Sequence, residues 1–96
     1  MHVISKKKLR EFWEEHVRAQ APLEQWYQVA RNAEWETFAD VRKTFDTADQ
    51  VGKFTVFDIG GNKYRLIAVI HFNRGKLFVR HVLTHAEYDE GKWKYD

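Results

Sequence analysis

The sequence contains no cysteine, and none of its apolar runs approaches the roughly 20 residues that a membrane-spanning helix needs. Without cysteine, the chain can form neither a disulfide framework nor a thiolate metal site. The opening "MHVISKKK" places its lysines after a very short apolar patch, whereas a signal peptide has the opposite order and a longer apolar segment. These absences argue against a secreted or membrane protein, and they predict a cytoplasmic one.

Aromatic residues are what the chain has in abundance. They make up 16% of its 96 residues, and each can bury about 150–250 Å² of surface. This length suits one domain spanning residues 1–96, with a core only just large enough to fold alone. We therefore expect a single globular domain.

Charge is distributed unevenly along the chain. Residues 1–50 carry eight basic and nine acidic side chains, whereas residues 51–96 carry eight basic and five acidic ones. The positive charge therefore concentrates in the second half, which favours polyanionic partners.

In the first half, apolar residues recur at helical spacing. They form three groups that each predict a helix: Leu9, Phe12, Trp13 and Val17; Leu23, Trp26, Tyr27 and Ala30; Phe38, Val41 and Phe45. Ser5 suits an N-cap for the first helix, and Pro22 suits the first turn of the second. Aromatic stripes of this kind are more typical of a core than of a cofactor site.

From residue 51 the pattern becomes typical of β-strands. "KFTVFDI", "KYRLIAVIHF" and "KLFVRHVL" are rich in β-branched and aromatic residues, and the turn formers "GGN" and "NRG" separate them. Such short turns imply antiparallel neighbours. We predict an α+β fold: a three-stranded antiparallel meander with the N-terminal helices packed on one face, extended by Val3–Ile4 or by a pair near the C-terminus.

Alternation along the middle strand assigns its side chains to two faces. One face is expected to be core and holds Tyr64, Leu66, Ala68, Ile70 and Phe72; the other holds Lys63, Arg65, Ile67, Val69 and His71. On the next strand, either Arg80 or His81 shares a face with Arg65, but the register is not fixed by the sequence.

The segment "LTHAEYDE" that follows the last strand admits two interpretations. Thr84 and Glu87 have the spacing of a capping box, so the segment can simply begin a short C-terminal helix. A helix beginning there also places His85 and Tyr88 on one face. Histidine exchanges protons near neutral pH, whereas Tyr88 would need nearby cations to lower its pKa.

Metal and phosphate-loop signals are weak. His81 and His85 are four residues apart, but one is expected in a strand and the other in a helix, so helical ligand spacing does not apply. "GGN" precedes a strand and is therefore interpreted as a hairpin turn. We expect no metal site and no cofactor.

"VFDIGGNKYRLIAVIHF" followed by "VRHVLTHAEYD", together with the opening "MHVISKKKLREFWE", resembles the HigB-type toxins of bacterial type II toxin–antitoxin systems. The resemblance covers nearly the whole chain. It implies the RelE-like fold, in which two or three N-terminal helices pack on a curved antiparallel sheet and a short C-terminal helix follows. It also implies cleavage of mRNA, usually in the ribosomal A site, without a cofactor. It also implies a HigA-like antitoxin with a helix-turn-helix, and contact with operator DNA only through the toxin–antitoxin complex.

Metal-free RNA cleavage needs a base, an acid and a positive charge near the scissile phosphate. Arg65 is the candidate for holding that phosphate, because a strand fixes it and guanidinium can bind phosphate bidentately. His85 is the candidate acid or base, and Tyr88 is a second proton-transfer group or a stacking platform. These three are the predicted catalytic residues.

Lys53, Lys63 and Arg80 are the predicted RNA-binding residues, since their charges can neutralise phosphates. The lysines can equally be solvated charges at strand edges. The alternative function is a non-catalytic module that binds RNA or protein, whereas a small-molecule enzyme is disfavoured because no cofactor motif is present. A ribonuclease needs Arg65, Arg80 and His85 to converge, and a docking surface does not.

Overall fold

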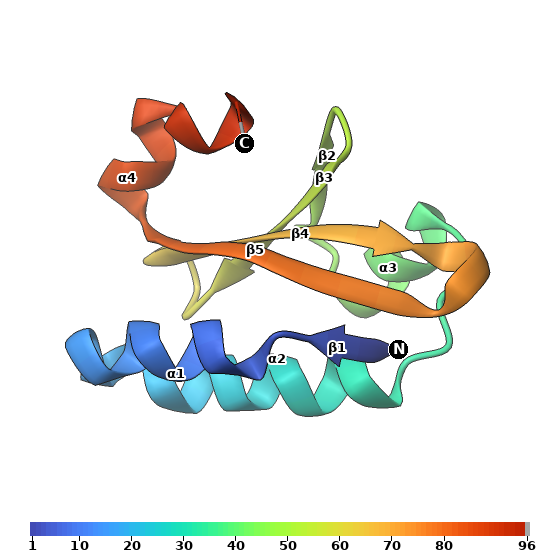
Figure 1. Ribbon diagram of the computed structural model, residues 1–96, viewed down its shortest axis with the longest axis horizontal. Helices are drawn as coiled ribbons and strands as arrows, with labels where there is room; N and C mark the ends of the chain where they lie inside the picture. Colours follow the sequence, from blue (N-terminus) through green and yellow to red (C-terminus); the bar gives the residue numbers. More distant parts are fainter. Residues whose placement is uncertain (96) are drawn as a thin grey trace.

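The computed structural model describes residues 1–95, which form a five-stranded sheet with helices on both faces (Figure 1). The strands are β1 (His2–Ile4), β2 (Asp49–Val51), β3 (Phe54–Ile59), β4 (Tyr64–His71) and β5 (Lys76–Thr84). The α-helices are α1 (Lys6–Glu15), α2 (Gln20–Asn32), α3 (Phe38–Thr44) and α4 (His85–Glu90), and the 3-10 helices are η1 (Val17–Ala19), η2 (Phe72–Arg74) and η3 (Lys92–Tyr95). The predicted α+β class is confirmed.

The sheet has the order β1-β5-β4-β3-β2, with β2 to β5 antiparallel in succession. The expected extension by Val3–Ile4 is present, but β1 lies parallel to β5, with Val3 opposite Leu77. The sheet is therefore mixed, whereas a purely antiparallel one was expected. A parallel neighbour requires a long connection, and the chain between β1 and β5 supplies it.

Strand β2 is an element that the sequence pattern did not reveal. Its residues are polar or only partly buried, so they lack the apolar alternation of a core strand. Gly52, with φ of +58°, turns the chain back into β3. This hairpin rises from the sheet on the same side as α4 (Figure 1).

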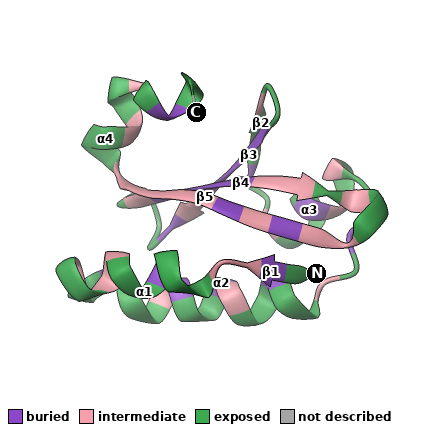
Figure 2. Ribbon diagram, viewed as in Figure 1, coloured by how far each residue is buried: buried purple, intermediate pink, exposed green. Residues whose placement is uncertain are grey.

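The main core lies between the sheet and helices α1, α2 and α3. Its fully buried members include Leu9, Leu23, Val41, Phe57, Leu66, Ala68 and Leu77. Complete burial of one such aliphatic side chain contributes about 1.5–3 kcal/mol. The face of β4 that alternation assigned to the core does pack here, and Figure 2 shows the helices burying only the stripe that faces the sheet.

The helix boundaries follow the predictions with small shifts. Helix α1 begins directly after Ser5, although the Ser5 side chain makes no capping hydrogen bond. Helix α2 begins at Gln20, two residues before Pro22, because η1 already turns the chain into it. No helix within residues 1–95 is long and apolar enough to cross a membrane.

The opposite face of the sheet is only partly covered. Phe54, Val56 and Ile67 form a second, smaller core with Trp93 of η3, so α4 and η3 cover one part of this face. The other part, toward β1, has no helix over it (Figure 1). We call this face of the sheet the exposed face. The part under α4 and η3 is its covered half, and the part toward β1 is its open half.

Strand β5 contains a bulge that settles which side chain faces Arg65. Ile67 pairs with His81, whereas Ala68 pairs with Val79, so Arg80 is the extra residue on β5. The bulge places His81 opposite Ile67, on the face that also carries Arg65. Arg80 is left at the free edge of β5, beyond the residues that pair with β1.

Candidate functional site

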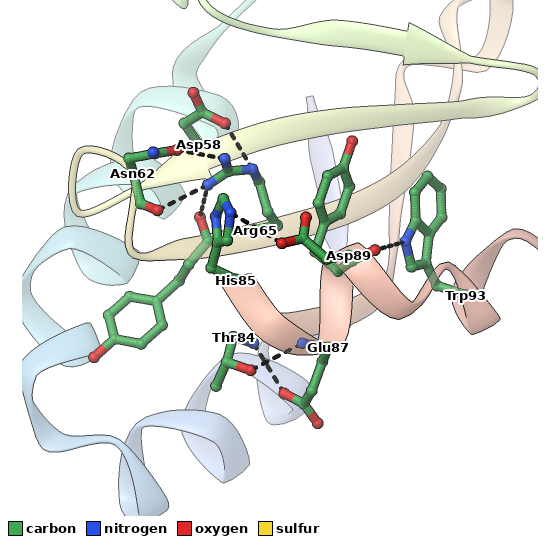
Figure 3. A network of polar contacts seen from close by, with 10 residues as sticks. Asp58, Asn62, Arg65, Thr84, His85, Glu87, Asp89 and Trp93 are labelled. Carbon is green, nitrogen blue, oxygen red and sulfur yellow. Dashed lines mark hydrogen bonds and ion pairs between the residues drawn. The ribbon is translucent and has the colours of Figure 1, made fainter.

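Helix α4 is fixed to the end of β5 by a reciprocal cap. The Glu87 backbone N–H donates to Thr84 Oγ1 at 3.2 Å, and the Thr84 backbone N–H donates to Glu87 Oε1 at 2.9 Å (Figure 3). The predicted capping box is therefore present. It does not compete with a chemical role for the segment, because the cap uses Thr84 and Glu87 and leaves His85 and Tyr88 available.

The imidazole of His85 is paired with a carboxylate one turn further along α4. His85 Nε2 lies 3.2 Å from Asp89 Oδ2, and the two side chains are 47% and 61% exposed. A carboxylate in this position orients the ring. The pair therefore presents to solvent a proton-transfer group with a fixed orientation.

Arg65 is buried, with only 8% of its surface exposed, and its guanidinium is occupied by protein oxygens. Its Nε lies 3.1 Å from Asp58 Oδ1, and its Nη1 donates to the backbone carbonyls of Asn62 and Tyr64, each at 3.2 Å. Its Nη2 donates to the side-chain oxygen of Asn62 (Figure 3). All three nitrogens are thus engaged in holding the β3–β4 turn, which leaves no free bidentate edge for a phosphate.

Tyr88 connects Arg65, which holds the β3–β4 turn, to the C-terminal part of the chain. Its ring lies 5.3 Å from the Arg65 guanidinium and stacks on Trp93 with a centroid separation of 5.2 Å. Trp93 Nε1 in turn donates to the Tyr88 backbone carbonyl at 3.0 Å. Tyr88 is therefore held on both sides, by the guanidinium and by an indole.

The pKa of Tyr88 is raised above its ordinary value. Burial is the largest cause, followed by the negative charge of Asp49, and these outweigh the opposing effect of Arg65. The lowered pKa that a tyrosine base requires is therefore absent, and the phenol stays protonated at neutral pH. It can act as a donor of a proton or a hydrogen bond.

The three predicted catalytic residues lie at one end of the sheet. Tyr88 contacts Arg65 directly, and His85 follows Thr84, which pairs with Tyr64 next to Arg65. Lys63 is exposed in the β3–β4 turn at this same end, since it directly precedes Tyr64.

Lys53 and Arg80 lie away from this cluster, so of the three residues expected to converge in a ribonuclease only Arg65 and His85 lie at the same end of the sheet. Lys53 occupies the β2–β3 turn, with its ammonium 5.1 Å from the centre of the Phe54 ring. Arg80 lies at the bulge, three residues before Leu83, the cross-strand partner of Arg65, so the two arginines are separated by about 10 Å along the sheet.

The pattern of the sequence did not single out Lys8 as a site residue. Its ammonium donates to the Arg80 backbone carbonyl at 3.0 Å, which brings α1 to the free edge of β5. A groove of about 340 Å³ runs there, lined by Lys8, Arg80 and His81 together with the acidic Glu11, Glu15 and Glu87. Predicting that Lys8 and Arg80 lie together would have required knowledge of the position of the bulge.

No group of three histidine or carboxylate side chains that could hold a metal ion occurs within residues 1–95.

Comparison with known proteins gives a family match. The family described as HigB_toxin, the RelE-like toxic component of a toxin–antitoxin system, matches residues 19–91. That range contains α2, the sheet from β2 to β5, and α4.

Curated relatives are similar over nearly their whole length. The mRNA interferase HigB of Escherichia coli O6:H1 (strain CFT073) is 34% identical over 93 residues, which cover 94% of this chain and 90% of the relative. The mRNA interferase toxin HigB of Escherichia coli (strain K12) and the mRNA interferase HigB of Shigella flexneri are each 28% identical over 92 residues, or 93% of this chain and 88% of each relative.

Proposed function

The chain belongs to the HigB family of RelE-like toxins of toxin–antitoxin systems, and on this premise we propose that it is an endoribonuclease that cleaves mRNA and thereby inhibits translation. The relatives that are named mRNA interferases support this activity. A cytoplasmic location is part of the proposal, because translated mRNA is the substrate.

The observation that carries the proposal is the exposed pair of His85 and Asp89 next to the protonated Tyr88. An imidazole and a phenol on adjacent positions of one helical face supply a base and an acid to the same phosphodiester. Packing of the core does not explain this pair, since the side chains of His85 and Asp89 are 47% and 61% exposed.

The proposed reaction needs no metal. His85 accepts the proton of the 2′-hydroxyl, whose oxygen attacks the adjacent phosphorus, while Asp89 stabilises the imidazolium that forms. The bond from phosphorus to the 5′-oxygen breaks, and Tyr88 supplies a proton to that leaving oxygen. The products are a 2′,3′-cyclic phosphate and a free 5′-hydroxyl.

In this mechanism Arg65 acts through Tyr88. Its guanidinium is committed to Asp58 and Asn62, so it fixes the turn and the phenol instead of gripping the phosphate. The exposed Lys63 and the more distant Lys53 and Arg80 then neutralise phosphates of the bound RNA.

We further propose that cleavage depends on the ribosome. The site offers few strong groups, and positioning of mRNA by the ribosome can supply much of the rate enhancement. Membership of a toxin–antitoxin family implies an antitoxin partner. We propose that this partner is HigA-like, carries a helix-turn-helix, and brings the toxin to operator DNA only within the complex.

The experiment that tests the proposal is primer extension on mRNA programmed into ribosomes, with ribosome-free RNA in parallel. Wild-type protein is expected to give discrete cuts only with ribosomes, and His85→Ala is expected to remove them. His2→Ala is the matched control, because His2 is an exposed histidine in β1, remote from α4. A thermal melt of each variant verifies that it is folded.

Three outcomes separate the possibilities. Cuts by His2→Ala but not by His85→Ala support the nuclease proposal. Equal cutting of free RNA contradicts the ribosome dependence. The absence of cuts by folded wild-type protein favours the alternative function, a non-catalytic module that binds RNA or protein.

A further inference from the structure

A second groove, of about 360 Å³, lies on the open half of the exposed face, away from α4. Its floor crosses three neighbouring strands, because Ile4 of β1 pairs with Phe78 of β5, which pairs in turn with Val69 of β4. These three side chains share one face of the sheet and remain only partly buried. The floor is therefore an apolar surface that contacts water.

An aromatic platform occupies this floor. The rings of Phe78 and His71 lie 5.4 Å apart in a T-shaped arrangement with an interplanar angle of 88°. The edge-to-face contact of His71 fixes the orientation of the Phe78 ring. No helix covers this part of the sheet in Figure 1, and Figure 2 shows β5 there as alternately buried and intermediate.

Cations border the platform. Arg80 and Lys8 both line the groove, and none of its lining residues is acidic. The hydrogen bond from the Lys8 ammonium to the Arg80 carbonyl keeps the two residues adjacent. Within residues 1–95, no hydrogen bond or ion pair of at most 4 Å engages the Arg80 guanidinium, unlike that of Arg65.

We propose that this groove is a nucleotide subsite for the RNA substrate, in which a base stacks on Phe78 beside His71 and a neighbouring phosphate binds Arg80 and Lys8. Aromatic faces combined with cations along a groove are the chemistry of single-stranded nucleic acid binding. The proposal rests on the proposed nuclease function and deepens it. Val69 lies four residues from Arg65 on β4, so the subsite is about 13 Å from the catalytic end.

The subsite therefore binds a nucleotide outside the scissile pair. RNA that reaches from α4 to this groove runs along β4 and β5, past the bulge at Arg80. Contacts along this path increase the affinity for RNA and fix its register at a site that has few catalytic groups. A base that stacks well on Phe78 is favoured at that position, so the groove contributes to the choice of cleavage position.

The test is fluorescence anisotropy of a labelled, 2′-O-methylated single-stranded RNA, which the full-length protein can bind but not cleave. Phe78→Leu keeps the apolar bulk and removes the ring, and it is expected to weaken affinity about 5- to 100-fold. Phe78→Tyr keeps the ring and is expected to bind like wild type. Tyr95→Leu is the control, because Tyr95 is 90% exposed and lies outside the groove.

Arg80→Gln tests the cation separately. Loss of one phosphate contact is expected to reduce the slope of log affinity against log salt by about 0.7. Arg42→Gln, on the exposed surface of α3, is the matched control and is expected to leave the slope unchanged. Urea unfolding of every variant confirms that the fold is intact.

Three results would overturn the subsite. RNA affinity could be equal in Phe78→Leu and wild type, or it could fall equally in Phe78→Leu and Phe78→Tyr. If the variants instead bound the antitoxin more weakly and RNA equally well, the groove would be a protein-docking surface. Cleavage of ribosome-bound mRNA is measured in parallel. Cleavage without dependence of RNA affinity on Phe78 overturns the subsite alone, whereas the absence of both cleavage and RNA binding overturns the nuclease proposal as well.

Discussion

Arg65 and Arg80 lie on neighbouring strands of the same sheet, yet their surroundings are opposite. Arg65 is buried under Tyr88, and its three guanidinium nitrogens contact Asp58, Asn62 and Tyr64. Arg80 is an extra residue at a bulge, half-exposed at a strand edge, and no ion pair holds its guanidinium within residues 1–95.

The difference separates two uses of one residue type. A guanidinium with all its nitrogens occupied stabilises a turn and positions what lies over it, whereas one with open donors can exchange water for a phosphate. The covered half of the exposed face therefore holds Arg65 and Tyr88 in place, whereas the open half leaves the Arg80 guanidinium accessible to a ligand. From the sequence alone, both arginines are predicted to contact RNA phosphates, and nothing in the pattern shows that only one of them is engaged by protein oxygens.

Replacing each arginine by alanine should give the largest difference in stability between the two sites. Arg65→Ala leaves Asp58 without its partner and removes the bonds to the β3–β4 turn, so the free energy of unfolding should fall by about 2–4 kcal/mol. Arg80→Ala should change it by less than about 0.5 kcal/mol. Urea denaturation of the two variants measures both values, and similar losses would contradict the division of roles.

Replacing each arginine by lysine sharpens the same contrast without removing charge. Lysine cannot reproduce the planar fork that reaches Asp58 and Asn62 together, so Arg65→Lys should lower stability by about 1–3 kcal/mol. Arg80→Lys should be nearly neutral in stability and should retain most of the RNA affinity. If Arg65→Lys were as stable as wild type, a single positive charge at this position would be enough to hold the β3–β4 turn.

The two capping boxes provide a matched pair for the covered half. Thr84→Ala and Thr37→Ala each remove one side-chain cap, and each should cost about 1 kcal/mol of stability. Only Thr84→Ala should also lower mRNA cleavage, by about tenfold, because α4 carries His85 and Tyr88. Chemical unfolding and primer extension on the same preparations give both readouts. Equal cleavage by the two variants would contradict a role of α4 in the site.

The smallest expected effect concerns the phenol over Arg65. Burial, and then Asp49, raise the pKa of Tyr88 above 10.0, with Asp58 and Asp89 adding to the rise and Arg65 opposing it. Because the folded pKa is the higher one, this contribution to stability is complete below pH 10.0 and declines as pH rises through the folded value. Unfolding of Tyr88→Phe followed across alkaline pH should show a shallower decline than wild type, and identical profiles would mean that Tyr88 does not titrate with folding.

Much of the fold could be predicted because local patterns and global packing agree. The stripe containing Leu9 and Phe12 and the alternation along β4 each describe a surface that packs on the core as expected. Val17, the last member of that stripe, is the exception, because α1 ends before it and its side chain is 73% exposed in η1. Thr84 and Glu87 form their cap because a capping box depends only on residues three apart. The weakly patterned β2 was missed because its polar, exposed residues give no apolar signal.

The candidate site was less predictable, since it depends on register and on contacts between segments distant in sequence. The bulge at Arg80 shifts every later side chain of β5 relative to β4, and one unpaired residue leaves no mark in the alternation. The commitment of Arg65 to Asp58 and Asn62 requires knowledge of how the β3–β4 turn closes. The roles of Arg65, His85 and Tyr88 in catalysis, and of Lys53, Lys63 and Arg80 in RNA binding, stay predictions.

The strand order has a consequence for how the toxin is made. Among the strands within residues 1–95, β1 lies at an edge of the sheet and pairs with β5, which is the last of them to be synthesised. A growing chain therefore presents β1 and the apolar side of α1 with no sheet to receive them until β5 has left the ribosome. Such long-range pairing slows folding. It also means that Ile4 and Phe78, the two sides of the proposed nucleotide subsite, meet only after β5 has left the ribosome.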